Sequence, residues 1–185
     1  MQKITLVTGN RNKLMEWQRI IGSELNLESS DIDLTEIQSL DLKEIVVHKA
    51  KSAYKKLKVP VVVEDISCSL DRLNGLPGPF IKFFVKQLGN DCLIILAGGK
   101  EGQAALVSCA VAYYDGKQEI VVQSDVKGKC VHPRGESGFG FDFGFIPYGS
   151  NKTFAEMTPK EKDTISHRNQ AIKKLLSELK KQAYL

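Results

Sequence analysis

Charged and polar side chains near the start of this chain have the spacing of a phosphate site. Residues 8–13 read Thr-Gly-Asn-Arg-Asn-Lys and stand between a predicted strand and a predicted helix. Gly9 permits a tight turn, the start of the helix offers unpaired N–H groups, and Lys13 adds a full positive charge, which together suit a phosphate. The Walker A pattern is absent. A plain turn in which Asn10 or Asn12 only caps the helix is the competing interpretation.

Paired carboxylates follow the β-branched run at residues 61–63. Glu64 and Asp65 are predicted to end a buried parallel strand, at the edge of the sheet where α/β folds bind ligands. Carboxylates in that place can hold Mg²⁺ or act as a general base. A solvated strand end is the alternative. Asp33 and Glu36 form a second acidic pair, which by itself is typical of an exposed loop.

Two lysines stand out by position. Lys49 falls on the inward stripe of a helix predicted at residues 41–58, so it either reaches the surface or points at an anion. Lys82 follows the Leu-Pro-Gly-Pro loop at residues 76–79 and by itself is typical of a surface lysine.

The second half of the chain holds a candidate surface for a planar base. Residues 139–142, Phe-Gly-Phe-Asp, combine glycine, which allows close backbone approach, with rings that can stack on a base. A bulged strand with core phenylalanines is the alternative. His167 and Arg168 are expected to lie exposed in the first turn of the last helix, after Ser166 as N-cap. Their donors could meet a carbonyl of the base.

Strands and helices must position these residues, and the hydrophobic periodicity of the sequence predicts where they lie. Strands are expected at residues 4–7, 61–63, 104–114, 119–126 and 128–131. Helices are expected at residues 10–21, 41–58, 80–88, 91–96 and 166–182. The turn at Asp115-Gly116 should join two antiparallel strands. The interleaving of strands and helices predicts an α/β class with a mixed sheet.

Composition sets the outer limits. The chain has 185 residues, 42% of them hydrophobic, which excludes a disordered chain and favours one domain. The net charge of +4 permits an anionic partner and identifies none. The four cysteines have no C-x-x-C spacing, which favours a reducing compartment over a metal or disulfide framework. No apolar run approaches the roughly 20 residues of a membrane span. A soluble, cytoplasmic protein is therefore expected.

The order of the motifs is more specific than any one of them. The series is Thr8-Gly9-Asn10-x-x-Lys13, Val63-Glu64-Asp65, Asn74-Gly75-Leu76-Pro77-Gly78-Pro79-Phe80-Ile81-Lys82, Phe139-Gly140-Phe141-Asp142, Ala155-Glu156-Met157 and Ser166-His167-Arg168. Over essentially the whole chain it resembles the inosine triphosphate pyrophosphatase family. The Leu-Pro-Gly-Pro-Phe-Ile-Lys loop is similar to the eukaryotic branch in particular.

The resemblance implies an α/β fold with an elongated mixed β-sheet flanked by helices. It implies a single domain, residues 1–185, with two lobes and a central nucleotide cleft. The implied enzyme is a cytoplasmic homodimer that needs Mg²⁺, or Mn²⁺ in its place. It hydrolyses the α–β bond of ITP, dITP and XTP to the monophosphate and pyrophosphate, which cleanses the nucleotide pool.

The resemblance also assigns roles to residues. For the triphosphate it implies Thr8, Gly9, Asn10, Arg11, Asn12, Lys13, Lys49 and Lys82. For the metal it implies Glu36 and Asp65. For the nucleoside it implies Phe139, Gly140, Phe141, Asp142, Lys162, His167 and Arg168. Lys13, Lys49 and Asp65 would be catalytic, with Asp65, or a water bound by it, as the general base.

Two positions depart from the family pattern. Ile66, counted with the substrate-binding residues, stands where the family usually has a serine or threonine. Phe143 stands where it usually has a proline. Neither change removes an expected metal ligand or phosphate lysine, so activity is expected to survive.

Base choice has a simple expectation. Hypoxanthine and xanthine carry an acceptor carbonyl where adenine carries an amino donor. Donors from Arg168, or from helix N–H groups near His167, would therefore satisfy the first two bases and repel the third.

Two other functions compete with this one. Maf-like nucleotide pyrophosphatases share the general fold and would prefer modified pyrimidine nucleotides. A nucleic-acid-binding module would use the lysine-rich helices, lose affinity steeply with salt and need no Mg²⁺. The motif series favours a small nucleoside triphosphate as the partner, and neither nucleic acid nor a membrane.

Overall fold

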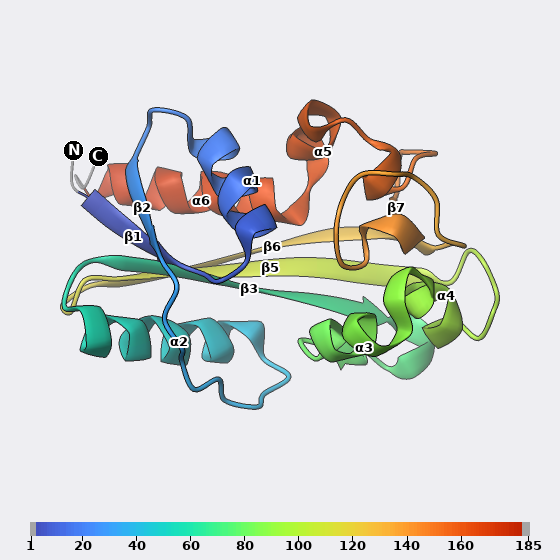
Figure 1. Ribbon diagram of the computed structural model, residues 1–185, viewed down its shortest axis with the longest axis horizontal. Coiled ribbons are helices and arrows are strands. Elements are labelled where there is room, and N and C mark those ends of the chain that lie inside the picture. Colours follow the sequence, from blue (N-terminus) through green and yellow to red (C-terminus); the bar gives the residue numbers. More distant parts are fainter. Residues whose placement is uncertain (1–2, 183–185) are drawn as a thin grey trace. The chain divides into compact units, whose positions relative to one another are not determined.

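The computed structural model describes residues 3–182 as a mixed sheet flanked by helices (Figure 1). The strands are β1 (Lys3–Val7), β2 (Asn26–Ser30), β3 (Val61–Leu70), β4 (Pro77–Gly78), β5 (Ala104–Tyr114), β6 (Glu119–Cys130) and β7 (Phe145–Pro147). The helices are α1 (Arg11–Ile21), α2 (Leu42–Leu57), α3 (Ile81–Leu88), α4 (Cys92–Leu96), α5 (Pro159–Ile165) and α6 (His167–Lys181). The expected α/β class is confirmed.

The sheet runs in the order β2-β1-β3-β5-β6-β7, with β4 paired to β3. β1 pairs in parallel with β2 and β3, whereas β3–β4 and β6–β7 are antiparallel, so the sheet is mixed as predicted. The predicted hairpin is also confirmed. The backbone N–H of Asp115 donates to Gln118 at 3.3 Å, and that of Cys130 donates to Gln103 at 2.9 Å, which keeps β5 and β6 in one antiparallel register.

The described chain forms two compact units, each with its own core. Unit 1 comprises residues 3–65, 109–124 and 168–182, and unit 2 comprises residues 66–108 and 125–167. β3, β5 and β6 contribute residues to both units.

Unit 1 has helices on both faces of its strands: α2 on one face, α1 and α6 on the other (Figure 1). The apolar stripe of α2 includes Val46, Ala50 and Ala53, which pack with Val61 and Val63 of β3. Asp41 begins the helix by accepting a hydrogen bond from the backbone N–H of Lys43 at 2.8 Å. These are the positions that the sequence predicts.

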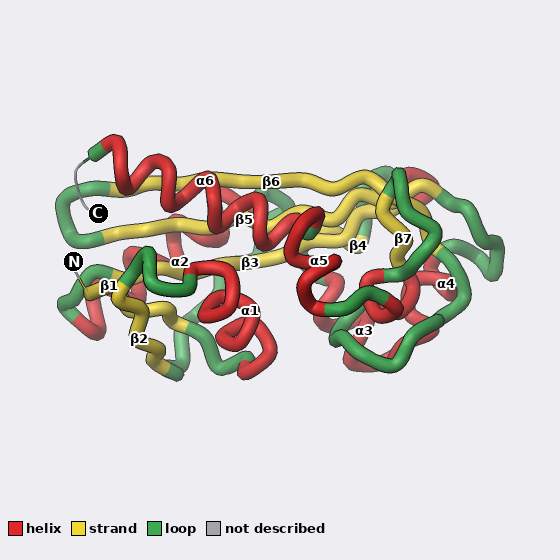
Figure 2. The backbone as a smooth tube through the Cα atoms, turned by 90° about the horizontal axis from the view of Figure 1, so that it is seen from above, coloured by secondary structure: helices red, strands yellow, loops and turns green. Residues whose placement is uncertain are grey.

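Unit 2 encloses a second core, with α3 and α4 packed together (Figure 2). Cys68 and Leu70 of β3, Leu93 of α4, Phe145 of β7 and Phe154 are all buried in it. Within residues 3–182, no helix has both the length and the apolar character that a membrane span requires.

Several features differ from the sequence prediction, among them the short strands β4 and β7, which were not predicted, and the continuous β6, which was predicted as two strands. β3 does not end at residue 63 but runs to Leu70, so Glu64 and Asp65 lie in mid-strand. The strand continues because Cys68 and Leu70 are fully buried and the Glu64 charge is paired. β2 was not predicted, since this edge strand reads Asn-Leu-Glu-Ser-Ser and lacks alternation of apolar and polar residues. The short helix α5 was missed too, although it carries a capping box from Thr158.

Candidate active site

The loop after β1 is held open by its own polar side chains. Thr8 Oγ1 accepts a hydrogen bond from the backbone N–H of Asn10 at 3.1 Å, and Asn10 Oδ1 accepts one from that of Lys13 at 3.1 Å. Asn10 therefore caps α1, as the plainer interpretation expects. Residues 9–12 are exposed, so the loop remains accessible to a ligand. A Cβ at Gly9 would lie 2.6 Å from Asp31 Oδ1, so a larger residue there would displace this exposed side chain.

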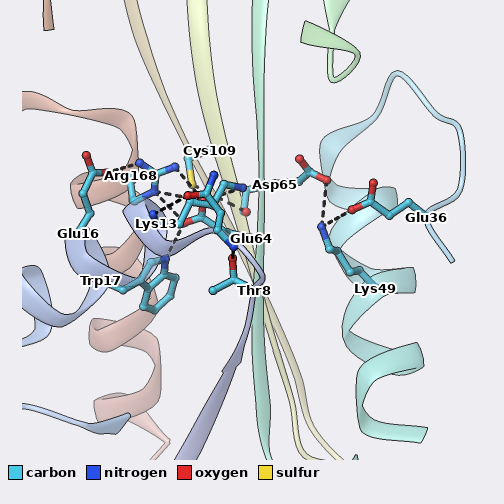
Figure 3. A network of polar contacts seen from close by, with 12 residues as sticks. Thr8, Lys13, Glu16, Trp17, Glu36, Lys49, Glu64, Asp65, Cys109 and Arg168 are labelled. Carbon is cyan, nitrogen blue, oxygen red and sulfur yellow. Dashed lines mark hydrogen bonds and ion pairs between the residues drawn. The ribbon is translucent and has the colours of Figure 1, made fainter. Parts of the chain in front are cut away.

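Successive residues of a strand point to opposite faces, and this separates the two acids of β3. Glu64 faces α1 and α6, whereas Asp65 faces α2 (Figure 3). The pair therefore does not form one dicarboxylate site, and each carboxylate belongs to a different cluster.

The first cluster surrounds Glu64 in the interior of unit 1 (Figure 3). Its carboxylate accepts hydrogen bonds from Arg168 Nε at 2.9 and 3.1 Å and from Arg168 Nη2 at 2.9 Å. It also accepts one from Trp17 Nε1 at 2.6 Å and lies 3.1 Å from Lys13 Nζ. Arg168 Nη1 pairs with Glu16 as well. Four charged side chains thus neutralise one another.

The charges of this cluster are stable because they are paired. Burial opposes ionisation of Glu64, but Arg168 and Lys13 outweigh it and hold the pKa of the carboxyl well below its ordinary value. Burial alone would lower the pKa of Arg168, whereas Glu64 and Glu16 raise it above its usual range. Both groups are therefore ionised.

The second cluster joins Lys49 of α2 to two carboxylates of unit 1 (Figure 3). Lys49 Nζ lies 2.7 Å from Glu36 Oε1 and 3.5 Å from Asp65 Oδ2. Burial disfavours the charged form of Lys49, but Asp65 and Glu36 outweigh it and raise the pKa above its ordinary value. Glu36 and Asp65, which the resemblance predicts to hold Mg²⁺, both lie beside the Lys49 ammonium group.

The donor set of this second cluster fits Mg²⁺. Mg²⁺ is usually held by one or two carboxylates, with waters and phosphate oxygens completing its coordination. Among residues 3–182 no group of three or more His, Cys, Asp or Glu side chains could hold a metal, so an all-protein cage is not what this part of the chain offers. Glu36 and Asp65 are the pair that could contribute.

Unit 2 gathers the residues predicted for the base. Asp142 Oδ2 accepts hydrogen bonds from Lys162 Nζ at 2.7 Å and from the backbone N–H of Phe139 at 3.0 Å. Lys162 Nζ lies 5.0 Å from the ring centroid of Phe139 and 5.6 Å from that of Phe154. Phe139 is partly exposed, so its ring can take a stacked partner, whereas Phe141 is buried in the core.

The expectation that His167 and Arg168 are exposed is wrong. Their exposed fractions are 2% and 1%, because neighbouring residues on a helix point in different directions and both find partners inside the protein. Arg168 pairs with Glu64 and Glu16, all within unit 1. The His167 ring lies in unit 2, 5.8 Å from that of Phe141 and 6.0 Å from that of Phe154.

Two further predicted residues belong to unit 2. Lys82 is exposed in the first turn of α3, with Nζ 5.1 Å from the ring centroid of Phe83. Ile66 packs against the core of unit 2.

The sequence prediction missed the roles of Glu16 and Trp17. Glu16 lies three residues and Trp17 four residues after Lys13, so all three share one face of α1. This spacing in the sequence could have identified them.

Comparison with known proteins places the chain in a family. Residues 4–178 match the sequence model of the Ham1 family. The chain belongs to the Ham1 family. A relative from Batrachochytrium dendrobatidis, named inosine triphosphate pyrophosphatase, is 42% identical over 174 residues, 93% of this chain and 91% of the relative. A relative of the same name from Schizosaccharomyces pombe is 38% identical over 177 residues, 95% of this chain and 94% of the relative.

Solved structures of the family share the fold. A HAM1 protein from Coxiella burnetii superimposes with a TM-score of 0.82 at 26% identity, covering 98% of this chain and 100% of the other. A Mycobacterium abscessus protein described as a nucleoside-triphosphatase and dITP/XTP pyrophosphatase superimposes with a TM-score of 0.72 at 29% identity, covering 94% and 98%. The resemblance seen in the motifs is therefore confirmed along the chain.

Proposed function

We propose that this chain hydrolyses the α–β phosphoanhydride bond of deaminated purine nucleoside triphosphates: ITP, dITP and XTP. The observation that carries the proposal is the convergence of Lys49, Glu36 and Asp65 in a chain whose relatives are named inosine triphosphate pyrophosphatases. Water would attack the α-phosphorus, the bond from that phosphorus to the bridging oxygen would break, and pyrophosphate would leave with the bridging oxygen.

The triphosphate would be bound by groups of unit 1. A nucleoside triphosphate carries close to four negative charges, which Lys13, Lys49 and the backbone N–H groups of the exposed residues Gly9, Arg11 and Asn12 would offset. Lys82, exposed in the first turn of α3, is the further phosphate lysine that the resemblance implies. These contacts stabilise the charge that grows on the leaving pyrophosphate.

Metal chemistry would act beside these groups. Glu36 and Asp65 would hold Mg²⁺, or Mn²⁺ in its place. When bound there, the metal would neutralise phosphate charge and polarise the phosphoryl oxygens. Asp65, or a water hydrogen-bonded to it, would accept the proton of the attacking water. With the metal on Glu36 and Asp65, the Lys49 ammonium group would move from these carboxylates to a phosphate oxygen, which also attracts it.

The nucleoside would be read by unit 2. Lys162 offers N–H donors beside the Asp142 acceptor, 2.7 Å away. Hypoxanthine and xanthine present the matching edge, an acceptor at C6 and a donor at N1, whereas adenine presents the reverse. The sequence predicts this role for Arg168 or for helix N–H groups near His167. The Arg168 guanidinium binds Glu64 and Glu16 in unit 1, whereas Lys162 lies in unit 2 beside the Phe139 ring, so we assign the role to Lys162. Phe139 would stack on any base and so supply affinity rather than choice.

Self-association is a further part of this proposal. Phe83 and Phe84 of α3 are 56% and 39% exposed, and Ile95 of the adjoining α4 is 51% exposed. These side chains support a homodimer that covers them. Sedimentation of Phe83→Asp against the unaltered chain tests it: a shift to monomer is expected, and an unchanged dimer would exclude this face.

The cellular setting follows from chemistry. All four cysteines are buried free thiols, which suits a reducing cytoplasm. The proposed partner is a small nucleotide, with neither nucleic acid nor membrane involved.

Product analysis tests the proposal. Phosphorus NMR of ITP with the protein and Mg²⁺ should show inosine monophosphate and pyrophosphate, and EDTA should abolish both. Release of single phosphates would contradict the assigned bond. Preference for modified pyrimidine triphosphates would favour the Maf-like alternative, and Mg²⁺-independent, salt-sensitive binding of RNA or DNA would favour the nucleic-acid alternative.

A further inference from the structure

We propose that Trp17 is a positioning residue of the triphosphate site: its indole N–H fixes the Glu64 carboxylate, and Glu64 in turn holds the ammonium group of Lys13. The inference rests on the proposed function, because it assumes that Lys13 binds phosphate.

The geometry links the three side chains directly (Figure 3). Trp17 Nε1 donates to Glu64 Oε2 at 2.6 Å, and Lys13 Nζ lies 3.1 Å from Glu64 Oε1. One carboxylate thus holds both groups, each on a different oxygen. α1 brings Lys13 and Trp17 to one face because they are four residues apart.

The burial of these groups makes the link rigid. Trp17 is fully buried, and the Glu64 side chain is 1% exposed. A buried indole N–H needs an acceptor, so Trp17 has a reason to stay on Glu64. The Lys13 side chain is 15% exposed and has a flexible four-carbon stem, so a fixed carboxylate limits where its ammonium can lie.

Charge balance shows what Trp17 contributes. Glu16 and Glu64 already offset Lys13 and Arg168, so the cluster is neutral without the indole. The Trp17 hydrogen bond adds no charge, and its effect is therefore on the orientation of the carboxylate. Loss of the N–H should let Glu64 turn toward Arg168 and release Lys13.

The direct test removes the N–H and keeps the ring. Trp17→Phe is measured for tripolyphosphate binding by calorimetry and for kcat and KM with ITP. With Lys13 no longer held in place, tripolyphosphate should bind about 5–10-fold more weakly, a loss of about 1–1.4 kcal/mol, and the KM for ITP should rise by the same factor. The matched control is Tyr113→Phe, which removes a buried aromatic hydroxyl bonded to Asp115 at 3.4 Å, outside the cluster. It should leave both constants unchanged.

A second reagent removes the N–H and keeps the bicyclic ring. Trp17 is the only tryptophan of the chain, so biosynthetic replacement of tryptophan by benzothienylalanine alters this position alone. This analogue has sulfur in place of the indole N–H. It should reproduce the loss seen with Trp17→Phe.

The Lys13→Met background decides whether the effect passes through Lys13. Trp17→Phe should cause no further loss in that background, and equal losses in both backgrounds would overturn the inference. Unchanged binding by either form lacking the Trp17 N–H would also overturn it, while leaving the proposed function intact. If Lys13→Met itself binds tripolyphosphate normally, the assigned phosphate site fails, and this inference fails with it.

Discussion

Breaking the buried pair between Glu64 and Arg168 should be among the most destabilising changes available to this chain. The two side chains are 1% and 2% exposed and share three nitrogen–oxygen contacts of 2.9–3.1 Å. Removing one partner leaves the other charge buried without its main counter-ion, which costs about 3–5 kcal/mol. Glu64→Met and Arg168→Met should each lower the free energy of unfolding by that amount.

The double variant gives the sharper test of this reasoning. With both charges replaced by methionine no unpaired charge remains in the pair, and Lys13 and Glu16, whose side chains are 15% and 10% exposed, keep some access to water. The loss should therefore fall short of the sum of the single losses by about 2–3 kcal/mol. Urea unfolding followed by circular dichroism and by Trp17 fluorescence measures each value, with coincident transitions as the check on two-state behaviour.

A matched surface pair provides the control. Lys180 and Glu24 lie 2.6 Å apart with side chains 55% and 48% exposed, so Lys180→Met should change the free energy of unfolding by less than about 1 kcal/mol. Two outcomes would show that the buried pair does not stabilise unit 1 in this way. The stability loss of the double variant could equal the sum of the two single losses, or the single losses could be as small as that of Lys180→Met.

Three further outcomes are expected. Asp65→Asn should lower kcat for ITP at least about 100-fold while the fold is kept, and near-normal turnover would exclude Asp65 as the base. Lys49→Met should tighten Mn²⁺ binding to the nucleotide-free protein in calorimetry, because its ammonium competes for both carboxylates; weaker binding would count against that competition. The pKa of Glu161 is lowered to about 2, chiefly by hydrogen bonds from Lys152 and the Thr158 N–H, so its contribution to stability exists above about pH 4.5 and disappears as the pH falls toward 2. Glu161→Gln should therefore flatten the acid limb of the urea midpoint against pH, and parallel curves would contradict it.

Local sequence signals predicted the elements whose structure depends mainly on nearby residues. The apolar stripe of α2 with Asp41 at its start, and the turn at Asp115 between β5 and β6, are encoded by nearby residues. The extension of β3 through Glu64 was not predictable in this way. Its counter-ion Arg168 is 104 positions away in the sequence, and only the fold brings the two together.

In the candidate site, too, local motifs identified some residues, whereas the positions of others depend on tertiary contacts. The motif series led to the loop at residues 8–13 and singled out Lys49, Glu36 and Asp65, which lie together in the structure. The side-chain direction of Arg168 could not be predicted, because a helix start usually faces water and here tertiary ion pairs override that tendency. The hydrogen bond from Trp17 to Glu64 was not predictable either. A tryptophan on an apolar helix face predicts core packing and does not indicate which acceptor its N–H will find.

The base preference proposed for this enzyme is measured by the ratio of kcat/KM for ITP to that for ATP, followed by pyrophosphate release with Mg²⁺. Adenine would face Lys162 and Asp142 with both hydrogen-bond partners reversed, and each mismatch costs about 1–3 kcal/mol. The ratio should therefore lie at roughly 10²–10⁴ in favour of ITP. Equal rates with the two nucleotides, or no pyrophosphate from either, would contradict the assignment of this chain as a pyrophosphatase for deaminated purine nucleotides.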